Sequence, residues 1–185
     1  MLRILFGAGL LAASSLSSAE TWNFTYTGFH DTVANAFDAG RQLTGSFVGS
    51  DADGDGTIGR AEITSLVLQG QDFVACEAQS NEYWHCGAEA FSYSPGGALA
   101  FSAGQYGSDP EGWVGGGHYF ISGDGEYGYS FRPSQWEEWG WQWTGRTAFA
   151  ISPAPEPATW TMLAAGLVLL LSAARLPGPR RAVPQ

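Results

Sequence analysis

The chain has 185 residues, of which 18 are Asp or Glu, 8 are Arg and none is Lys, so its net charge at pH 7 is −10. A surface this acidic repels nucleic acid phosphates and anionic lipid headgroups, which excludes nucleic acid binding, and it favours the capture of divalent cations. Apolar residues gather at the two ends, and the roughly 135 residues between them are enough for one domain.

Residues 1–19 have the features of a secretory signal peptide. Arg3 forms a short positive region, residues 4–13 are apolar, and the small residues Ser17 and Ala19 close the segment. Signal peptidase accepts small side chains at these two positions, so we expect cleavage after Ala19. An uncleaved membrane anchor is the alternative, but the apolar run is shorter than a bilayer-spanning helix requires. The sequence therefore predicts export, with signal peptidase as the first partner.

Residues 20–151 are predicted to form an acidic all-β domain. Residues 22–29 alternate aromatic and polar side chains, as a half-buried strand does. Similar short runs recur at residues 91–93, 99–101, 118–121, 127–131, 139–143 and 147–151. Gly, Pro, Asp and Ser separate these runs at hairpin spacing. We therefore expect an antiparallel sandwich or barrel of about eight strands.

Residues 51–62 resemble the twelve-residue calcium loop of the EF-hand. Ca²⁺ takes hard oxygen ligands, and clustered carboxylates repel one another unless a cation neutralises them. Three Asp side chains, one backbone carbonyl and a closing Glu carboxylate would provide these oxygens. The predicted ligands are Asp51, Asp53, Asp55, Thr57 and Glu62.

The segment before this loop is predicted to be a strand and not the helix of an EF-hand, because residues 41–49 alternate with a period of two. One unpaired loop without a Met-rich groove favours a structural ion over a calcium sensor. The loop would link a strand ending near Val48 to a strand through Ile63, with Ile58 anchored in the core. An acidic turn without specific affinity for Ca²⁺ is the alternative.

Cys76 and Cys86 are the only cysteines. Export places them in an oxidising compartment, where such a pair normally forms a disulfide. A metal site that includes His85 is the alternative, but it lacks further soft ligands.

Four tryptophans near the end of the body could be core residues or a sugar-binding surface. Trp139, Trp141 and Trp143 share one parity on a strand, as the core face of a sandwich would. Exposed aromatic rings can bind the apolar faces of pyranoses, so the four tryptophans could instead form a sugar-binding surface. We therefore take Trp136 as a possible glycan-binding residue, although the core is the favoured position for the other three.

Catalytic signals are few, and no catalytic residue is predicted. Glu137 and Glu138 are adjacent, so on a strand they point to opposite faces and cannot flank one glycosidic bond. His30, His85 and His118 stand apart in the sequence. Hydrolase-elbow, zinc-protease and phosphate-loop motifs do not occur.

The C-terminal end combines a spacer with an apolar segment. Residues 152–157 are proline-rich and stay extended, because each Pro disfavours helix at the residue before it. Residues 158–174 carry no charge and are just long enough to span a membrane. They are followed by Arg175, Arg180 and Arg181. The positive-inside rule places this tail in the cytoplasm and the body outside, which favours a membrane helix over a buried core helix.

The motif Pro155-Glu156-Pro157, the apolar segment and the terminal Arg cluster together resemble the PEP-CTERM sorting signal of Gram-negative bacteria. The resemblance covers residues 155–185. It implies recognition by exosortase, a membrane transpeptidase-like enzyme that acts at or near the Pro-Glu-Pro site. It also implies an association with exopolysaccharide, biofilm and floc.

These features predict a non-enzymatic protein sorted by exosortase to the cell surface or extracellular matrix, with a structural Ca²⁺. Its precursor would sit in the inner membrane through residues 158–185, with the N-terminus outside. The alternative is a calcium-dependent carbohydrate-binding module that acts on exopolysaccharide. The acidic domain would then meet polysaccharide through its exposed aromatic residues.

Overall fold

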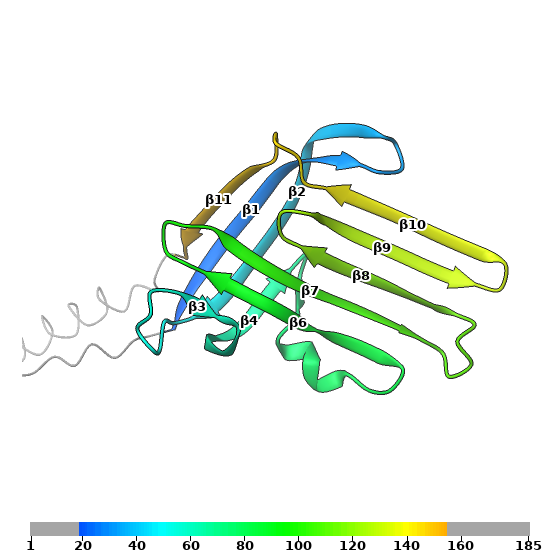
Figure 1. Cartoon of the computed structure of the whole chain (residues 1–185), viewed down its shortest axis with the longest axis horizontal. Coiled ribbons are helices and arrows are strands. Elements are labelled where there is room, and N and C mark those ends of the chain that lie inside the picture. Colours follow the sequence, from blue (N-terminus) through cyan, green and yellow to red (C-terminus); the bar gives the residue numbers. More distant parts are fainter. Residues whose placement is uncertain (1–18, 155–185) are drawn as a thin grey trace, which may run out of the picture. The chain divides into compact units, whose positions relative to one another are not determined.

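The computed structural model describes residues 19–154, which form a single antiparallel sheet of eleven strands (Figure 1). The strands are β1 (Glu20–Asp31), β2 (Ala36–Gly49), β3 (Ile58–Gly59), β4 (Ile63–Leu68), β5 (Gln71–Asp72), β6 (Trp84–Tyr93), β7 (Leu99–Ser108), β8 (Gly115–Ile121), β9 (Gly125–Arg132), β10 (Gln135–Gln142) and β11 (Ala148–Pro153). Two short 3₁₀ helices, η1 (Arg60–Glu62) and η2 (Ala75–Gln79), are the only helical elements of this part of the chain. The prediction of an all-β domain is confirmed, but the expected count of about eight strands is too low.

The first strand has two partners along the same edge. Its residues 22–27 pair with β11, whereas His30 and Asp31 pair with β10. The change of partner follows a β-bulge between Thr27 and Phe29, where Gly28 has a φ of +87° that other residues rarely adopt. On the other side, β2 pairs with β1 over nearly its whole length. The bulge therefore lies where β1 changes its partner from β11 to β10 and so joins the strands β6–β10.

The sheet folds over itself, and its core lies between the two parts. Phe47 of β2 packs against Phe91 and Tyr93 of β6, with ring centroids 4.8 and 5.3 Å apart. Phe24 of β1 lies 5.7 Å from Phe101 of β7. In Figure 1, β1, β2 and β4 accordingly lie behind β6 and β7. One continuous folded sheet, with hydrogen-bonded order β3-β6-β7-β8-β9-β10-β1-β2-β4-β5, replaces the predicted sandwich or barrel.

The last strand carries the chain to the end of the compact unit at Pro153. Ser152 and Pro153 pair with Asn23 and Trp22, so β11 includes two residues that were expected to begin the spacer. A proline is tolerated here because β11 lies at an edge of the sheet, where its missing N–H breaks no ladder. The predicted signal peptide, the Pro155-Glu156-Pro157 motif and the C-terminal helix lie outside the described residues. Within residues 19–154, the structure contains no helix with the length and hydrophobicity needed to cross a membrane.

Candidate functional site

The predicted calcium loop connects β2 to β4 and also reaches the other part of the sheet. The strand before it ends at Gly49 and the strand after it begins at Ile63, as the sequence predicted, and these two residues pair with each other. Between them, β3 pairs with Tyr93 and Ser92 of β6. Ile58 is buried, which confirms its expected role as the core anchor of the loop. The loop therefore contains a short strand, β3, that joins it to the other part of the folded sheet.

The Asp51 carboxylate organises the first half of the loop. Its oxygens accept hydrogen bonds from the backbone N–H groups of Gly54, Asp55 and Gly56, at 2.8, 3.1 and 2.9 Å. Gly54 and Gly56 both have a positive φ, which lets the chain turn sharply around this carboxylate.

The Glu62 carboxylate closes the loop from its other end. One oxygen accepts a hydrogen bond from Ala52 N–H at 2.7 Å and the other accepts one from Gly59 N–H at 2.8 Å. The hydrogen bonds from Gly59 and then Ala52 lower the pKa of Glu62, so it is ionised at neutral pH. Residues at the two ends of the twelve-residue segment are thus held together by one carboxylate.

The three Asp side chains converge, as a cation site requires. Carboxylate oxygens of Asp51, Asp53 and Asp55 lie within 4.8 Å of one another. The Thr57 hydroxyl hydrogen bonds with Ser94 at 3.1 Å, which ties the loop to the turn after β6. The carboxylate oxygens of the three Asp residues are ligands of the kind that Ca²⁺ prefers, whereas Zn²⁺ or Cu²⁺ would be expected with His or Cys ligands.

Cys76 and Cys86 pair at disulfide distance, as predicted, with Cα atoms 5.6 Å apart. Both are buried, and the bridge joins η2 to β6. Beside it, the Arg60 guanidinium forms an ion pair with Glu77 and donates to Ala88 O at 2.6 Å. Both sulfur atoms are used in the bridge, so the alternative metal site with His85 is not formed.

Trp139, Trp141 and Trp143 divide between core and surface. Trp141 and Trp143 pack against the core, as expected, but Trp139 is 39% exposed, which corrects the prediction that it is a core residue. Trp139 lies on the same face of β10 as Trp141, but beyond the two residues of β10, Trp141 and Gln142, that pair with β1. Figure 1 shows β8, β9 and β10 running away from β1 beyond this junction.

Trp136 lies on the outward face and is 61% exposed. Its ring is nearly parallel to those of Tyr129 and Phe131, at interplanar angles of 12° and centroid distances of 5.5 and 6.0 Å. Its indole N–H donates to a Glu138 carboxylate oxygen at 3.1 Å. The ring is therefore held in one orientation while most of its surface remains open to solvent.

A buried ionic cluster, centred on Glu126, was not predicted from the sequence. Glu126, only 2% exposed, accepts hydrogen bonds from the Arg41 guanidinium at 2.7 Å and pairs with His118 Nε2 at 3.0 Å. Burial raises the pKa of Glu126, but the hydrogen bonds from His118 and Arg41 outweigh burial and hold it below its ordinary value. The Arg41 guanidinium also lies 4.9 Å from the centre of the Trp141 ring. The one hint in the sequence was an Arg placed in a strand of a very acidic domain.

The described residues thus define an acidic, disulfide-bridged all-β domain with one loop in which three Asp carboxylates converge. Comparison of the chain with protein family models, curated proteins and solved structures finds no match in any of the three. The features that bear on function are therefore the loop, the aromatic residues and the two ends of the sequence.

Proposed function

We propose that this chain is an exported, non-enzymatic protein of the cell surface or extracellular matrix, whose β domain is stabilised by Ca²⁺ at residues 51–62. The observation that carries the proposal is the convergence of Asp51, Asp53 and Asp55 within 4.8 Å, in a loop that Glu62 closes. The loop contains β3, which pairs with β6. An ion bound there would therefore stabilise the contact between the two parts of the sheet as well as the loop.

The energetic reason is mutual repulsion of the three carboxylates. Without a cation, their charges oppose the turn that brings them together, whereas a bound Ca²⁺ makes the same arrangement favourable. Because the unfolded chain does not hold these oxygens together, binding shifts the folding equilibrium. At a free calcium concentration one hundred times the Kd, the gain is about 2.7 kcal/mol.

The calcium proposal is tested by thermal unfolding of the purified protein in EDTA and in excess Ca²⁺. We expect Ca²⁺ to raise the Tm by several degrees, and Asp51→Ala to remove most of this rise. Glu137→Ala, which removes one exposed acidic group outside the loop, should keep the full rise. An equal calcium effect in both variants, or none in the wild type, would refute a specific site. The comparison uses the calcium-dependent rise in Tm, because Asp51 also supports the loop through backbone hydrogen bonds.

Export and sorting are proposed from the two ends of the sequence. Signal peptidase would cut after Ala19, and exosortase would act near Pro155-Glu156-Pro157 while residues 158–185 hold the precursor in the inner membrane. The intact mass of the protein in the spent medium should show both cuts. A full-length protein that stays in the inner membrane would refute release, and a soluble intracellular protein with its leader would refute export.

A second candidate function is calcium-dependent carbohydrate binding, for example to the exopolysaccharide of the producing cell. It is favoured by the 61% exposed, stacked ring of Trp136. Pull-down on that exopolysaccharide should retain the wild type and lose Trp136→Ala. Trp113→Ala is a matched control, because Trp113 is also highly exposed but lies between strands. Equal retention of both variants would argue against a role for Trp136.

A further inference from the structure

The strands β6–β9 carry aromatic side chains on the face that points away from the core. Phe101 and Ala103 of β7 and Phe120 of β8 point into the core, so Tyr106 and Tyr119 point outward. The backbone register places four outward residues in one row across the strands. This row is His85 (β6), Tyr106 (β7), Gly117 (β8) and Tyr129 (β9).

Glycines on β8 let these rings lie flat against the sheet. A Cβ atom on Gly117 would lie 2.6 Å from the Tyr129 ring and 2.9 Å from Cβ of Tyr106. One on Gly115 would lie 2.5 Å from the Phe131 ring. Any larger residue would push the rings away from the strand. Gly115 and Gly117, in a glycine run without phosphate-binding context, therefore form the floor beneath an aromatic surface.

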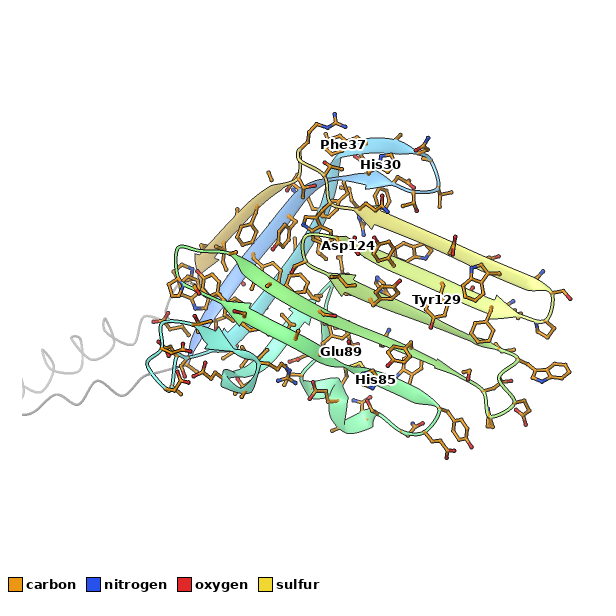
Figure 2. The ribbon with its side chains drawn as sticks, in the orientation of Figure 1. His30, Phe37, His85, Glu89, Asp124 and Tyr129 are labelled. Carbon is orange, nitrogen blue, oxygen red and sulfur yellow. A yellow bond between two sulfur atoms is a disulfide. The ribbon has the colours of Figure 1, made fainter. Side chains whose placement is uncertain are left out.

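Two adjoining cavities open on this surface. The first, of about 340 Å³, is lined by residues that include Tyr83, Trp84, His85, Tyr106, Tyr129 and Phe131. The second, of about 310 Å³, is lined by residues that include Glu89, Ser102, Gly104, Tyr106, Tyr119 and Tyr129. Because Tyr106 and Tyr129 line both, the two cavities form one groove, which we call the aromatic groove. Figure 2 shows His85 and Glu89 along β6 and Tyr129 on β9.

The lining of the aromatic groove suits an uncharged sugar chain. The negative faces of aromatic rings attract the C–H groups on the flat side of a pyranose, and the Tyr hydroxyls with Ser102 and Ser108 can bind sugar hydroxyls. The lining contains the carboxylates Glu82 and Glu89 but no Arg or Lys. An acidic sugar would therefore meet like charge with no Arg or Lys in the lining to compensate it.

We propose that the aromatic groove binds a chain of uncharged pyranoses and rejects polyuronates. The proposal rests on the second candidate function and deepens it, since it names the binding residues and the class of sugar. It places the glycan across β6–β9, beside Trp136, which stacks on Tyr129 and Phe131 and extends the aromatic surface onto β10.

The test measures binding of the full chain, in mild detergent with Ca²⁺, to defined hexasaccharides. The uncharged probes are β-1,4-glucan, β-1,3-glucan, α-1,4-glucan, β-1,4-mannan and β-1,4-linked N-acetylglucosamine, and the acidic probe is oligogalacturonate. We expect calorimetry to detect at least one uncharged probe and no acidic one. Tyr106→Ala should weaken this binding at least tenfold, because Tyr106 lines both cavities and is 43% exposed. Trp113→Ala should bind like the wild type.

The acidic lining is tested separately with the double variant Glu82→Gln and Glu89→Gln. Both side chains are exposed, so the variant should fold with an unchanged Tm. We expect it to bind the uncharged probe as before and to gain measurable affinity for oligogalacturonate. Continued rejection of the acidic probe would overturn the proposed role of these carboxylates in selectivity.

The remaining outcomes separate this proposal from the ones before it. Binding that Trp136→Ala abolishes but Tyr106→Ala leaves unchanged would support a carbohydrate-binding protein and overturn the groove. No binding to any uncharged probe, or tighter binding to oligogalacturonate, would overturn the groove as a site for neutral glycans. The calcium proposal is judged by thermal unfolding alone, so it can stand or fall independently.

Discussion

The two parts of the folded sheet use aromatic residues in different ways. In β1, β2 and β4, aromatic and aliphatic side chains on one face are fully buried, as Phe24 at 2% and Phe47 at 0% exposure illustrate. In β8–β10, rings occur on both faces and many remain in contact with solvent, with Trp136 at 61% and Trp139 at 39%. The difference shows that alternation of aromatic residues predicts a strand but not the burial of its rings. Burial depends on whether the other part of the sheet packs against that face.

The largest effect on stability is expected from a substitution that creates a cavity in the packed part of the sheet. Phe47→Ala removes a fully buried ring that contacts Phe91, Tyr93 and Trp22, so it should lower the free energy of unfolding by about 3–5 kcal/mol. Urea unfolding followed by fluorescence measures the loss. Val33→Ala, at a 71% exposed position, should change it by less than about 0.5 kcal/mol. A loss below about 1 kcal/mol for Phe47→Ala would contradict the packing of the two parts.

The next effect concerns Glu126, the buried charge that links β9 to Arg41 of β2 and His118 of β8. Glu126→Gln keeps the shape of the side chain but removes its charge. We expect this variant to lose about 3 kcal/mol of unfolding free energy at pH 7. This value is at the low end for a broken buried ion pair, because Arg41 is partly exposed. The pKa of Glu126 is lower in the folded than in the unfolded state. Its ionisation therefore stabilises the fold above the unfolded pKa, and this contribution is lost as pH falls through the folded pKa.

Unfolding curves of wild type and Glu126→Gln at pH 7 and pH 3 check this expectation. The difference in unfolding free energy between them should shrink at the lower pH, because the Glu126 carboxyl of the unfolded wild-type chain is then protonated and part of the stabilisation from its ionisation in the folded state is lost. A difference that stays constant between the two pH values would show that the variant acts through packing and not through its charge.

The disulfide should contribute slightly less. Cys76 and Cys86 are ten residues apart, and a closed loop of this size adds roughly 2–3 kcal/mol by restricting the unfolded chain. Reduction of the wild type, or Cys76→Ala with Cys86→Ala, should lower the unfolding free energy by that amount. Reductant should not change the unfolding free energy of the double variant. A change there would show that the reductant acts on the protein by a route other than the disulfide.

The sequence predicted best what depends on neighbouring residues. The ligand positions of the acidic loop lie within twelve residues, so their spacing alone predicted that Asp51, Asp53 and Asp55 would come together. The alternation in β1 likewise predicted burial of Phe24 and Tyr26, because one face of this strand is covered along most of its length. Both features are local, and both were found without knowledge of the fold.

Features that depend on long-range register were missed. Strands β3 and β5 have two residues each, too few to leave a periodic pattern, which explains part of the low strand count. The ion pair between Arg41 and Glu126 joins residues 85 positions apart, so no local pattern could connect them. Trp139 is 39% exposed although it has the same parity as Trp141, because parity gives the face of a residue but not what packs against that face.

The smallest effect on stability is expected at the aromatic surface, where the contrast with the packed part of the sheet is greatest. Trp136→Ala removes a large ring that is 61% exposed and makes contact only along one side, so the loss of unfolding free energy should stay below about 1 kcal/mol. Urea unfolding alongside Phe47→Ala measures both rings in one series. A loss comparable to that of Phe47 would mean that Trp136 belongs to the packing of the sheet, and a lowered affinity for glycans in this variant would then reflect unfolding. A small loss would mean that the fold does not require the Trp136 ring. A lowered affinity for glycans in this variant could then be assigned to a lost binding contact, because the variant remains folded.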